Sequence, residues 1–264
     1  FRMDAIKHFA ACRLAWSEVM TRRWLIGQSI FLVLSAALLL LVFENSSLDL
    51  VLARPFFDAE LNDFPLRKNG FFTPVFYYGS KFSVTAAGVM ALAICGLGCY
   101  GRLTWLPKKN AWLAMLGLIL IPTAVALLKQ QTNRHCPWDV AEFGGFAPYF
   151  GLLAEVPAGI VRGVCFPAGH ASIGFMWLAV GLALHTYSPQ LSRRVVWGAL
   201  VLGILMGLTR QAQGGHFVSH TLWSAWIAWA ISLSLAFSLG LAGRSTAERA
   251  EHQAPDGGRE YQAQ

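Results

Sequence analysis

The chain has 264 residues, of which 55% are hydrophobic and 13% are charged. Several apolar runs are long enough to cross a bilayer core of about 30 Å, which excludes a soluble domain. The net charge of +7 would suit a nucleic-acid partner, but the basic residues lie mainly in short connections between apolar runs. Basic residues in such places set membrane orientation, so we expect the bilayer as a partner and no nucleic acid.

Six apolar runs predict an all-α integral membrane bundle. The first run begins near Trp24 and has no small-residue cleavage site, so we expect an uncleaved span and not a signal peptide. The predicted spans cover roughly residues 24–43, 84–100, 111–128, 170–186, 195–209 and 217–241. They divide the chain into an N-terminal segment, 1–23, a membrane domain, 24–241, and a polar tail, 242–264, that buries too little apolar surface to be ordered.

The basic residues predict the orientation of the bundle. An even number of spans puts both termini on one side of the membrane. Thirteen of the 21 Lys and Arg lie on that side, namely Arg2, Lys7, Arg13, Arg22, Arg23, Arg102, Lys108, Lys109, Arg193, Arg194, Arg244, Arg249 and Arg259. The other eight are Arg54, Arg67, Lys68, Lys81, Lys129, Arg134, Arg162 and Arg210, spread over longer connections. Both termini are therefore predicted to be cytoplasmic.

The long outer connection, 44–83, mixes aromatic residues with charges. Its aromatic and proline residues include Pro55, Phe56, Phe57, Pro65, Phe71, Phe72, Tyr77 and Tyr78. Such a composition is typical of chain that lies at the level of the lipid headgroups. Two interpretations stay open, an interfacial helix beside the functional site and an aromatic belt that only anchors the fold.

Three polar clusters follow at the outer ends of predicted spans. They are KQQTNRHCPWD at 129–139, PAGH at 167–170 and RQAQGGHFVSH at 210–220. Ionisable residues at membrane depth are costly unless they are paired or used in function. Cations together with backbone N–H groups at a glycine-containing helix start bind phosphate, and histidine acts as nucleophile or proton donor near neutral pH. The clusters therefore predict a site for a phosphoryl group.

The order and spacing of these clusters resemble the type 2 phosphatidate phosphatase superfamily, which also includes the vanadium haloperoxidases. That family carries K-x6-R-P, then P-S-G-H, then S-R-x5-H-x3-D. The matching residues here are Lys129 and Pro137 in the first motif, Pro167, Gly169 and His170 in the second, and Arg210 and His216 in the third.

The resemblance implies a role for each matching residue. His216 is expected to attack phosphorus and form a phosphohistidine. His170 is expected to protonate the leaving lipid oxygen and later to activate water. Lys129, Arg210 and the backbone around Gly169 are expected to hold the phosphoryl oxygens.

The chain departs from the family pattern in all three motifs. Thr209 replaces a serine, and Cys136 replaces the arginine of the first motif, which removes a bidentate contact to the phosphoryl group. We expect Arg134, two residues upstream, to supply the missing guanidinium. Ala168 replaces the serine of the second motif, so position 168 is expected to hold phosphate through its backbone N–H alone.

The third motif ends on His220 where the family has an aspartate. The resemblance implies that this residue holds the nucleophilic imidazole in its useful tautomer. A neutral histidine can accept the same hydrogen bond, with less stabilisation of an imidazolium. Asp139 and Glu142 are the alternatives for this orienting role.

Two of the five cysteines are predicted to face an oxidising compartment. Cys12 lies on the inner side, and Cys95 and Cys99 lie within the second predicted span. The outer pair, Cys136 and Cys165, lies just before Pro137 and Pro167, so a disulfide between them would tie the first two motif loops together. The alternative is two unpaired thiols.

The same histidines also allow a zinc site. His216 and His220 are four residues apart and share one helical face, and His170 or Cys136 would supply a third ligand. This hypothesis predicts activity that is lost to chelators, whereas a phosphohistidine mechanism needs no metal and no other cofactor.

The sequence therefore predicts a metal-independent membrane phosphatase that acts on a lipid phosphate or diphosphate at the periplasmic face of a Gram-negative inner membrane. Phosphatidate, phosphatidylglycerophosphate, undecaprenyl diphosphate and a lipid A phosphate are the expected substrates. Two alternatives stay open, a phosphotransferase from a polyprenyl diphosphate to another lipid, and a non-catalytic lipid-binding or lipid-transport protein. The sequence assigns no role to His135, Trp138 or the pair Gly214–Gly215.

Overall fold

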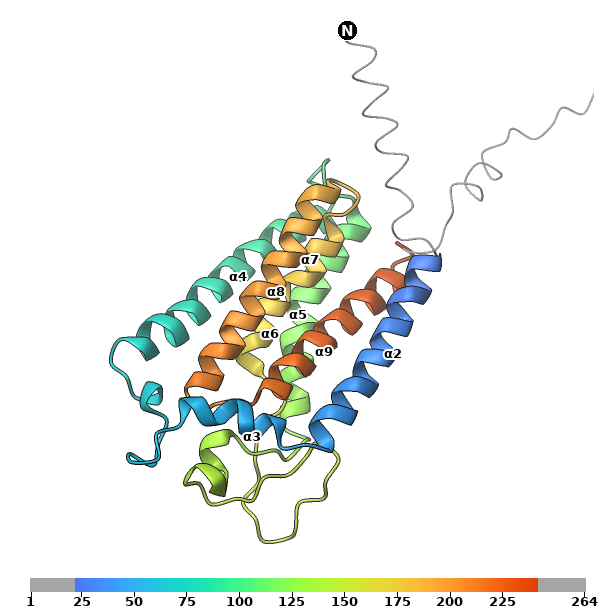
Figure 1. The fold of residues 1–264 in the computed structure, drawn as a ribbon. Coiled ribbons are helices and arrows are strands. Elements are labelled where there is room, and N and C mark those ends of the chain that lie inside the picture. The colour runs from blue at the N-terminus through green and yellow to red at the C-terminus, as the bar shows by residue number, and fades with distance from the viewer. Residues whose placement is uncertain (1–21, 242–264) are drawn as a thin grey trace, which may run out of the picture.

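The computed structural model describes residues 22–241, which form an all-helical bundle (Figure 1). The predicted tail, 242–264, and residues 1–21 of the N-terminal segment lie outside the described residues. Five helices are long and apolar enough to cross a membrane, namely α2 (Arg22–Glu44), α4 (Ser80–Cys99) with the π-helix η3 (Thr73–Gly79) before it, α5 (Lys108–Lys129), α8 (Pro189–Ala212) and α9 (Val218–Ser238). Within residues 22–241 there are isolated β-bridges but no strand.

The fourth predicted span is shorter than the others. It folds as α6 (Gly169–Phe175) and α7 (Trp177–Ala183), which together rise about 22 Å and fall short of a bilayer core of about 30 Å. Both pieces lie inside the bundle in contact with α5, α8 and α9 (Figure 1). The prediction of six full-length spans is thus not confirmed, because burial by neighbouring helices also explains this apolar run.

Small residues let the central helices approach closely. A Cβ atom on Gly117 of α5 would lie 2.1 Å from the Cβ of Ala179 in α7. A Cβ on Gly174 of α6 would lie 2.6 Å from the backbone of Gly203 in α8. Glycine and alanine at these positions hold α6 and α7 rigidly against their neighbours, which fixes the direction of the second motif at the start of α6.

The outer connection, 44–83, contains the short helices α3 (Leu48–Ala53), η1 (Arg54–Phe56) and η2 (Pro65–Arg67) before η3. Phe64 is only 1% exposed and packs edge-on against Phe57 and Phe143, with ring centroids 5.4 and 5.5 Å apart. Phe71 and Tyr78, in contrast, stay exposed. One portion of the segment is therefore buried and another presents aromatic rings to the surroundings, and the two interpretations of the segment stay predictions.

The connection from α5 to α6 holds two short 3-10 helices, η4 (Pro137–Asp139) and η5 (Ala141–Phe143). It lies at the same end of the bundle as α3, whereas α2 begins and α9 ends at the opposite end (Figure 1). Residues 22 and 241 thus lie at one end of the bundle and the three motifs at the other. The assignment of these ends to cytoplasm and periplasm stays a prediction.

Candidate active site

The first two motif loops are joined at several points. Cys136 and Cys165 form a disulfide, as expected from their sequence positions, with Cα atoms 5.2 Å apart. Beside it, the Cys165 N–H donates to the Arg134 carbonyl at 2.8 Å and the Gly163 N–H donates to the Asn133 side chain at 2.9 Å. A covalent link and a short parallel pairing thus fix the two loops relative to each other.

The pair Gly214–Gly215 shapes the third motif. Gly214 has a φ of +71°, and a Cβ there would lie 2.4 Å from the Phe64 ring. A Cβ on Gly215 would lie 2.4 Å from the guanidinium of Arg210. The Gly214 carbonyl accepts a hydrogen bond from the Trp138 N–H at 3.1 Å. The two glycines therefore let the chain turn tightly beside Arg210 and dock on the first loop.

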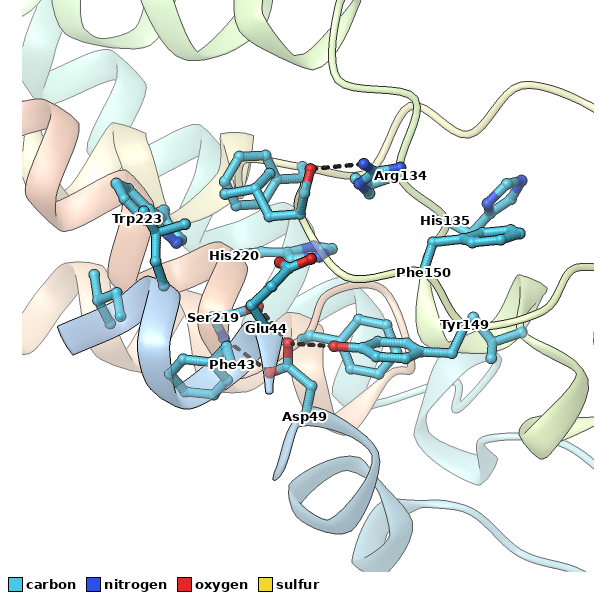
Figure 2. A pocket seen from close by; sticks show the side chains of 16 residues that line it. Phe43, Glu44, Asp49, Arg134, His135, Tyr149, Phe150, Ser219, His220 and Trp223 are labelled. Atoms are coloured by element: carbon cyan, nitrogen blue, oxygen red, sulfur yellow. Dashed lines mark hydrogen bonds between the residues drawn. The ribbon is translucent and has the colours of Figure 1, made fainter. Parts of the chain in front are cut away.

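Asp49 of α3 caps the helix that follows the third motif. Its carboxylate accepts the Ser219 N–H at 3.0 Å, the Ser219 hydroxyl, and the Tyr149 hydroxyl at 3.3 Å (Figure 2). Burial raises the pKa of Asp49, and these hydrogen bonds work in the opposite direction. Sequence reasoning missed Asp49, although an acidic residue in a short outer helix is a usable signal for a helix cap.

A pocket of about 360 Å³ lies between the first and third motifs, and no residue of the second motif lines it. It is lined by Lys129, His135, Cys136, Trp138, Asp139, Phe146, Arg162, Gly163, Val164, Arg210, Gly215 and His216. Three of these residues are cations, from the end of α5, the loop before α6 and the last turn of α8. Within residues 22–241 none of the three forms an ion pair, since Arg67 and Lys68 are the basic residues that pair with an acid. The pocket therefore has the charge to bind an anion.

Arg210 is held in the pocket wall by a hydrogen bond and two aromatic rings. It donates to the Gln213 side-chain oxygen at 2.8 Å. Its guanidinium carbon lies 4.6 Å from the ring centroid of Tyr77 and 5.0 Å from that of Trp138. Arg67 also stacks on Trp138, at 4.4 Å. The Trp138 ring thus makes cation–π contacts with two guanidinium groups.

His170 lies beside this basic wall. Its Nε2 is 3.3 Å from the Ser80 hydroxyl, and its ring centroid is 4.8 Å from that of Tyr77. The Tyr77 ring therefore contacts both His170 and Arg210. Space beside Gly169, the first residue of α6, is open to 4 Å. Sequence reasoning missed Tyr77 and Ser80, which belong to the π-helix and the start of α4.

His216 forms part of the pocket wall and is only 3% exposed. Burial lowers the pKa of its imidazole well below the ordinary value. The neighbouring basic groups lower it further, in the order His220, Lys129, Arg210 and His170. The imidazole is therefore neutral near pH 7, and one ring nitrogen keeps a lone pair.

Arg134 does not reach this pocket, contrary to the role expected for it. Its guanidinium donates to the carbonyls of Leu152 and Ala154, both at 2.6 Å. These bonds hold the loop after η5 and leave the side chain 7% exposed. The structure instead brings Arg162 to the pocket, where it also donates to the Gln130 carbonyl.

Ala168 likewise has no donor to offer a ligand. Its side chain is fully buried in the core beside Phe175. Its N–H donates to the His220 carbonyl at 3.2 Å, which joins the second motif to α9. The expected phosphate contact at position 168 is therefore replaced by a contact between motifs.

No hydrogen bond within residues 22–241 joins His216 to any of the three expected orienting residues. Asp139 accepts the Cys136 N–H at 3.3 Å, and Glu142 is exposed. The ring centroid of His220 is 5.8 Å from that of His216, at an angle of 66°. His220 instead packs edge-on against Phe166 and Phe217. The His216 Nδ1 lies 3.4 Å from the Cys165 sulfur.

A second, much smaller cavity of about 20 Å³ lies between α2, α3 and α9 (Figure 2). Glu44, Asp49, Arg134, Ser219 and His220 are among its lining residues. The Arg134 Nε and the His220 Nδ1 are buried without a partner in the described part of the chain. A cavity of this size is large enough for one water molecule.

The residues that lie close enough to share a zinc ion differ from the expected ligands. The Cys165 sulfur and one ring nitrogen each from His216 and His220 lie within 4.8 Å of one another. Cys165 is part of the disulfide, so its sulfur carries no thiolate charge. Two imidazoles are left, fewer than the three protein ligands of a catalytic zinc site. The residues present therefore fit an anion better than they fit zinc.

These observations define a helical membrane protein with a buried neutral histidine at the wall of a basic pocket. Residues 110–240 match the PAP2 superfamily. The chain is 25% identical over 203 residues to the lipid A 4'-phosphatase of Francisella tularensis subsp. novicida, covering 72% of this chain and 88% of that protein. No solved structure matches. The chain belongs to the PAP2 superfamily, which confirms the resemblance to the type 2 phosphatidate phosphatases and their membrane lipid phosphatase branch.

Proposed function

We propose that this protein removes phosphate from a membrane lipid through a phosphohistidine formed on His216, without a metal ion. The observation that carries this proposal is a neutral imidazole at the wall of a pocket whose three cations have no acidic partner in residues 22–241. A neutral imidazole is the nucleophilic form, and unpaired cations stabilise the charge that develops on a transferring phosphoryl group.

The reaction proceeds in two displacements. The His216 Nε2 forms a bond to phosphorus while the bond from phosphorus to the lipid oxygen breaks, and His170 donates a proton to that oxygen. Water then attacks the phosphohistidine, His170 accepts a proton from it, and inorganic phosphate leaves. Lys129, Arg210 and Arg162 hold the phosphoryl oxygens through both steps.

The site is proposed to face the periplasm of a Gram-negative cell from the inner membrane. The disulfide at the motif end of the bundle supports this orientation, because disulfides persist in oxidising compartments. A phosphate on lipid A is the first substrate to test, because the curated relative is named for that activity. Phosphatidate, phosphatidylglycerophosphate and undecaprenyl diphosphate complete the panel.

The test is phosphate release by purified protein from each of these lipids in detergent, with chelator present. We expect release from at least one lipid, and a loss of at least about 10³-fold in kcat for His216→Ala. Release that disappears with chelator and returns with zinc would overturn metal independence. Binding of the lipids without phosphate release from any of them would overturn the proposal that the protein is an enzyme. Phosphate recovered on an added acceptor lipid instead of in solution would show a phosphotransferase.

A further inference from the structure

The Cys136–Cys165 disulfide lies directly against the proposed nucleophile. The Cys165 sulfur is 3.4 Å from the His216 Nδ1, and both residues are buried, at 0% and 3% exposure. The same sulfur is 3.0 Å from the Gly215 carbonyl oxygen. Neither that sulfur nor that oxygen carries a hydrogen, so this second contact is packing. The sulfur therefore packs between the Gly215 carbonyl and the His216 imidazole ring.

The chemistry of the sulfur decides which nitrogen of His216 is protonated. A neutral imidazole carries one proton, on either Nδ1 or Nε2. A disulfide sulfur has no proton to donate and accepts weakly, so its contact with Nδ1 is a hydrogen bond only when Nδ1 carries the proton. The Nε2 then keeps its lone pair, which is what attack on phosphorus requires. A family aspartate would select the same tautomer, but here that position is His220, whose ring centroid lies 5.8 Å away.

We propose that the Cys136–Cys165 disulfide is the positioning group of His216, with the Cys165 sulfur accepting the Nδ1 proton so that Nε2 stays free to attack the phosphoryl group. This proposal rests on the proposed function, because it assigns a partner to the nucleophile of that reaction. The disulfide is a neutral acceptor. It therefore fixes the tautomer without the stabilisation of positive charge on the ring that a carboxylate gives.

Reduction of the Cys136–Cys165 disulfide should change which nitrogen of His216 carries the proton. A dithiol such as dithiothreitol breaks the S–S bond and delivers two electrons and two protons, which gives thiols at Cys136 and Cys165 and a cyclic disulfide in the reagent. The new S–H of Cys165 is a donor. When it donates to Nδ1, the ring proton must lie on Nε2 and the attacking lone pair is lost. The reduced enzyme is therefore inactive even where the loops stay folded.

The test compares two double variants that both lack the disulfide and differ in the group at position 165. Cys136→Ala with Cys165→Ala has no acceptor, and Cys136→Ala with Cys165→Asp restores one. We expect kcat to fall at least about 10²-fold in the first variant with little change in KM, and to recover about tenfold in the second. A carboxylate next to an imidazole raises its pKa, so the acid limb of the pH–rate profile moves to higher pH in the second variant.

A disulfide that only staples the loops gives a different result. The two double variants would then have equal kcat and the same acid limb, and this outcome overturns the proposal. Wild-type protein treated with dithiothreitol provides a second measurement that needs no folded variant. Loss of kcat should track the number of new thiols and reverse on reoxidation. Cys95→Ala with Cys99→Ala, which removes the free cysteines of α4, is the matched control and should keep wild-type activity and the same sensitivity to the reductant.

The outcome separates the two proposals. If wild-type protein releases no phosphate, or His216→Ala retains activity, the proposed function fails. If wild-type protein is active, His216→Ala is inactive and the Ala–Ala variant keeps full kcat, the proposed function stands and the positioning role of the disulfide fails.

Discussion

The two cavities at the motif end of the bundle use charge in opposite ways. In the basic pocket, Lys129, Arg162 and Arg210 have no acidic partner within residues 22–241. In the small cavity, the Arg134 guanidinium is occupied by two backbone carbonyls and the Asp49 carboxylate by Ser219 and Tyr149 (Figure 2). A charge is available for a ligand only where the protein has not already satisfied it.

The largest expected effect of a single charge change is in the basic pocket. Replacing Arg210 by Met should lower kcat/KM on the order of 10²–10³-fold, because a charge-assisted contact to the developing phosphoryl charge is lost. Lys108→Met, at the opposite end of α5 from Lys129, is the matched control and should change activity less than about twofold. A similar loss in both variants would show that net charge, and not the pocket, matters.

A substitution in the small cavity should lower the stability of the protein. Asp49→Ala removes the remote cap of α9 and leaves the Ser219 N–H and hydroxyl unpaired, so the free energy of unfolding should fall by about 2–3 kcal/mol. Thermal unfolding in detergent measures this loss, with Glu60→Ala, an exposed acid of the same outer connection, as control. If Asp49→Ala abolishes kcat while its unfolding temperature is unchanged, the structural role assigned to Asp49 is wrong.

His216 in the basic pocket should also make stability depend on pH. The pKa of His216 is lowered in the folded protein by burial, so the unfolded chain binds a proton more readily below its ordinary pKa of about 6.5. Stability from this group is complete above that pH and falls as pH drops, by up to about 1.4 kcal/mol per pH unit. His216→Gln should lack this component in unfolding curves measured from pH 7 to 5. Equal slopes for both proteins would contradict the neutral state assigned to His216.

The smallest expected effect separates the two arginines of the loops. Arg162→Gln should raise KM about tenfold with kcat changed only severalfold, because it removes one outer phosphate contact. Arg134→Gln should leave KM unchanged and lower the unfolding temperature, because two loop carbonyls lose their donor. Steady-state kinetics and thermal unfolding of both variants give the answer. The reverse pattern would restore Arg134 to the phosphate site.

Part of this architecture follows from the sequence because it depends on local pattern. Apolar runs located the five long helices, and the ordered spacing of Lys129, Arg210 and His216 placed three residues on one pocket. The short helices α6 and α7 could not be distinguished from a full span, because an apolar run looks the same whether lipid or other helices cover it.

The remainder depends on contacts between distant segments. Asp49 meets Ser219 across 170 residues, and no periodicity signals such a pairing. The choice between Arg134 and Arg162 depends on the path of the irregular loop before α6, which has no repeating pattern. The disulfide could be predicted because Cys136 and Cys165 are the two cysteines that the predicted topology places at the motif end of the bundle.

The π-helical winding of Thr73–Gly79 has a geometric consequence for the pocket. One residue more or less in a helix rotates everything on one side of the change by about 100° around the axis relative to the other side. Tyr77 lies within this wider winding, and its ring contacts both His170 and Arg210. A single-residue deletion between Thr73 and Gly79 would convert the segment to an ordinary helix. The Tyr77 ring would then point away from His170 and Arg210, although no residue of the three motifs had changed.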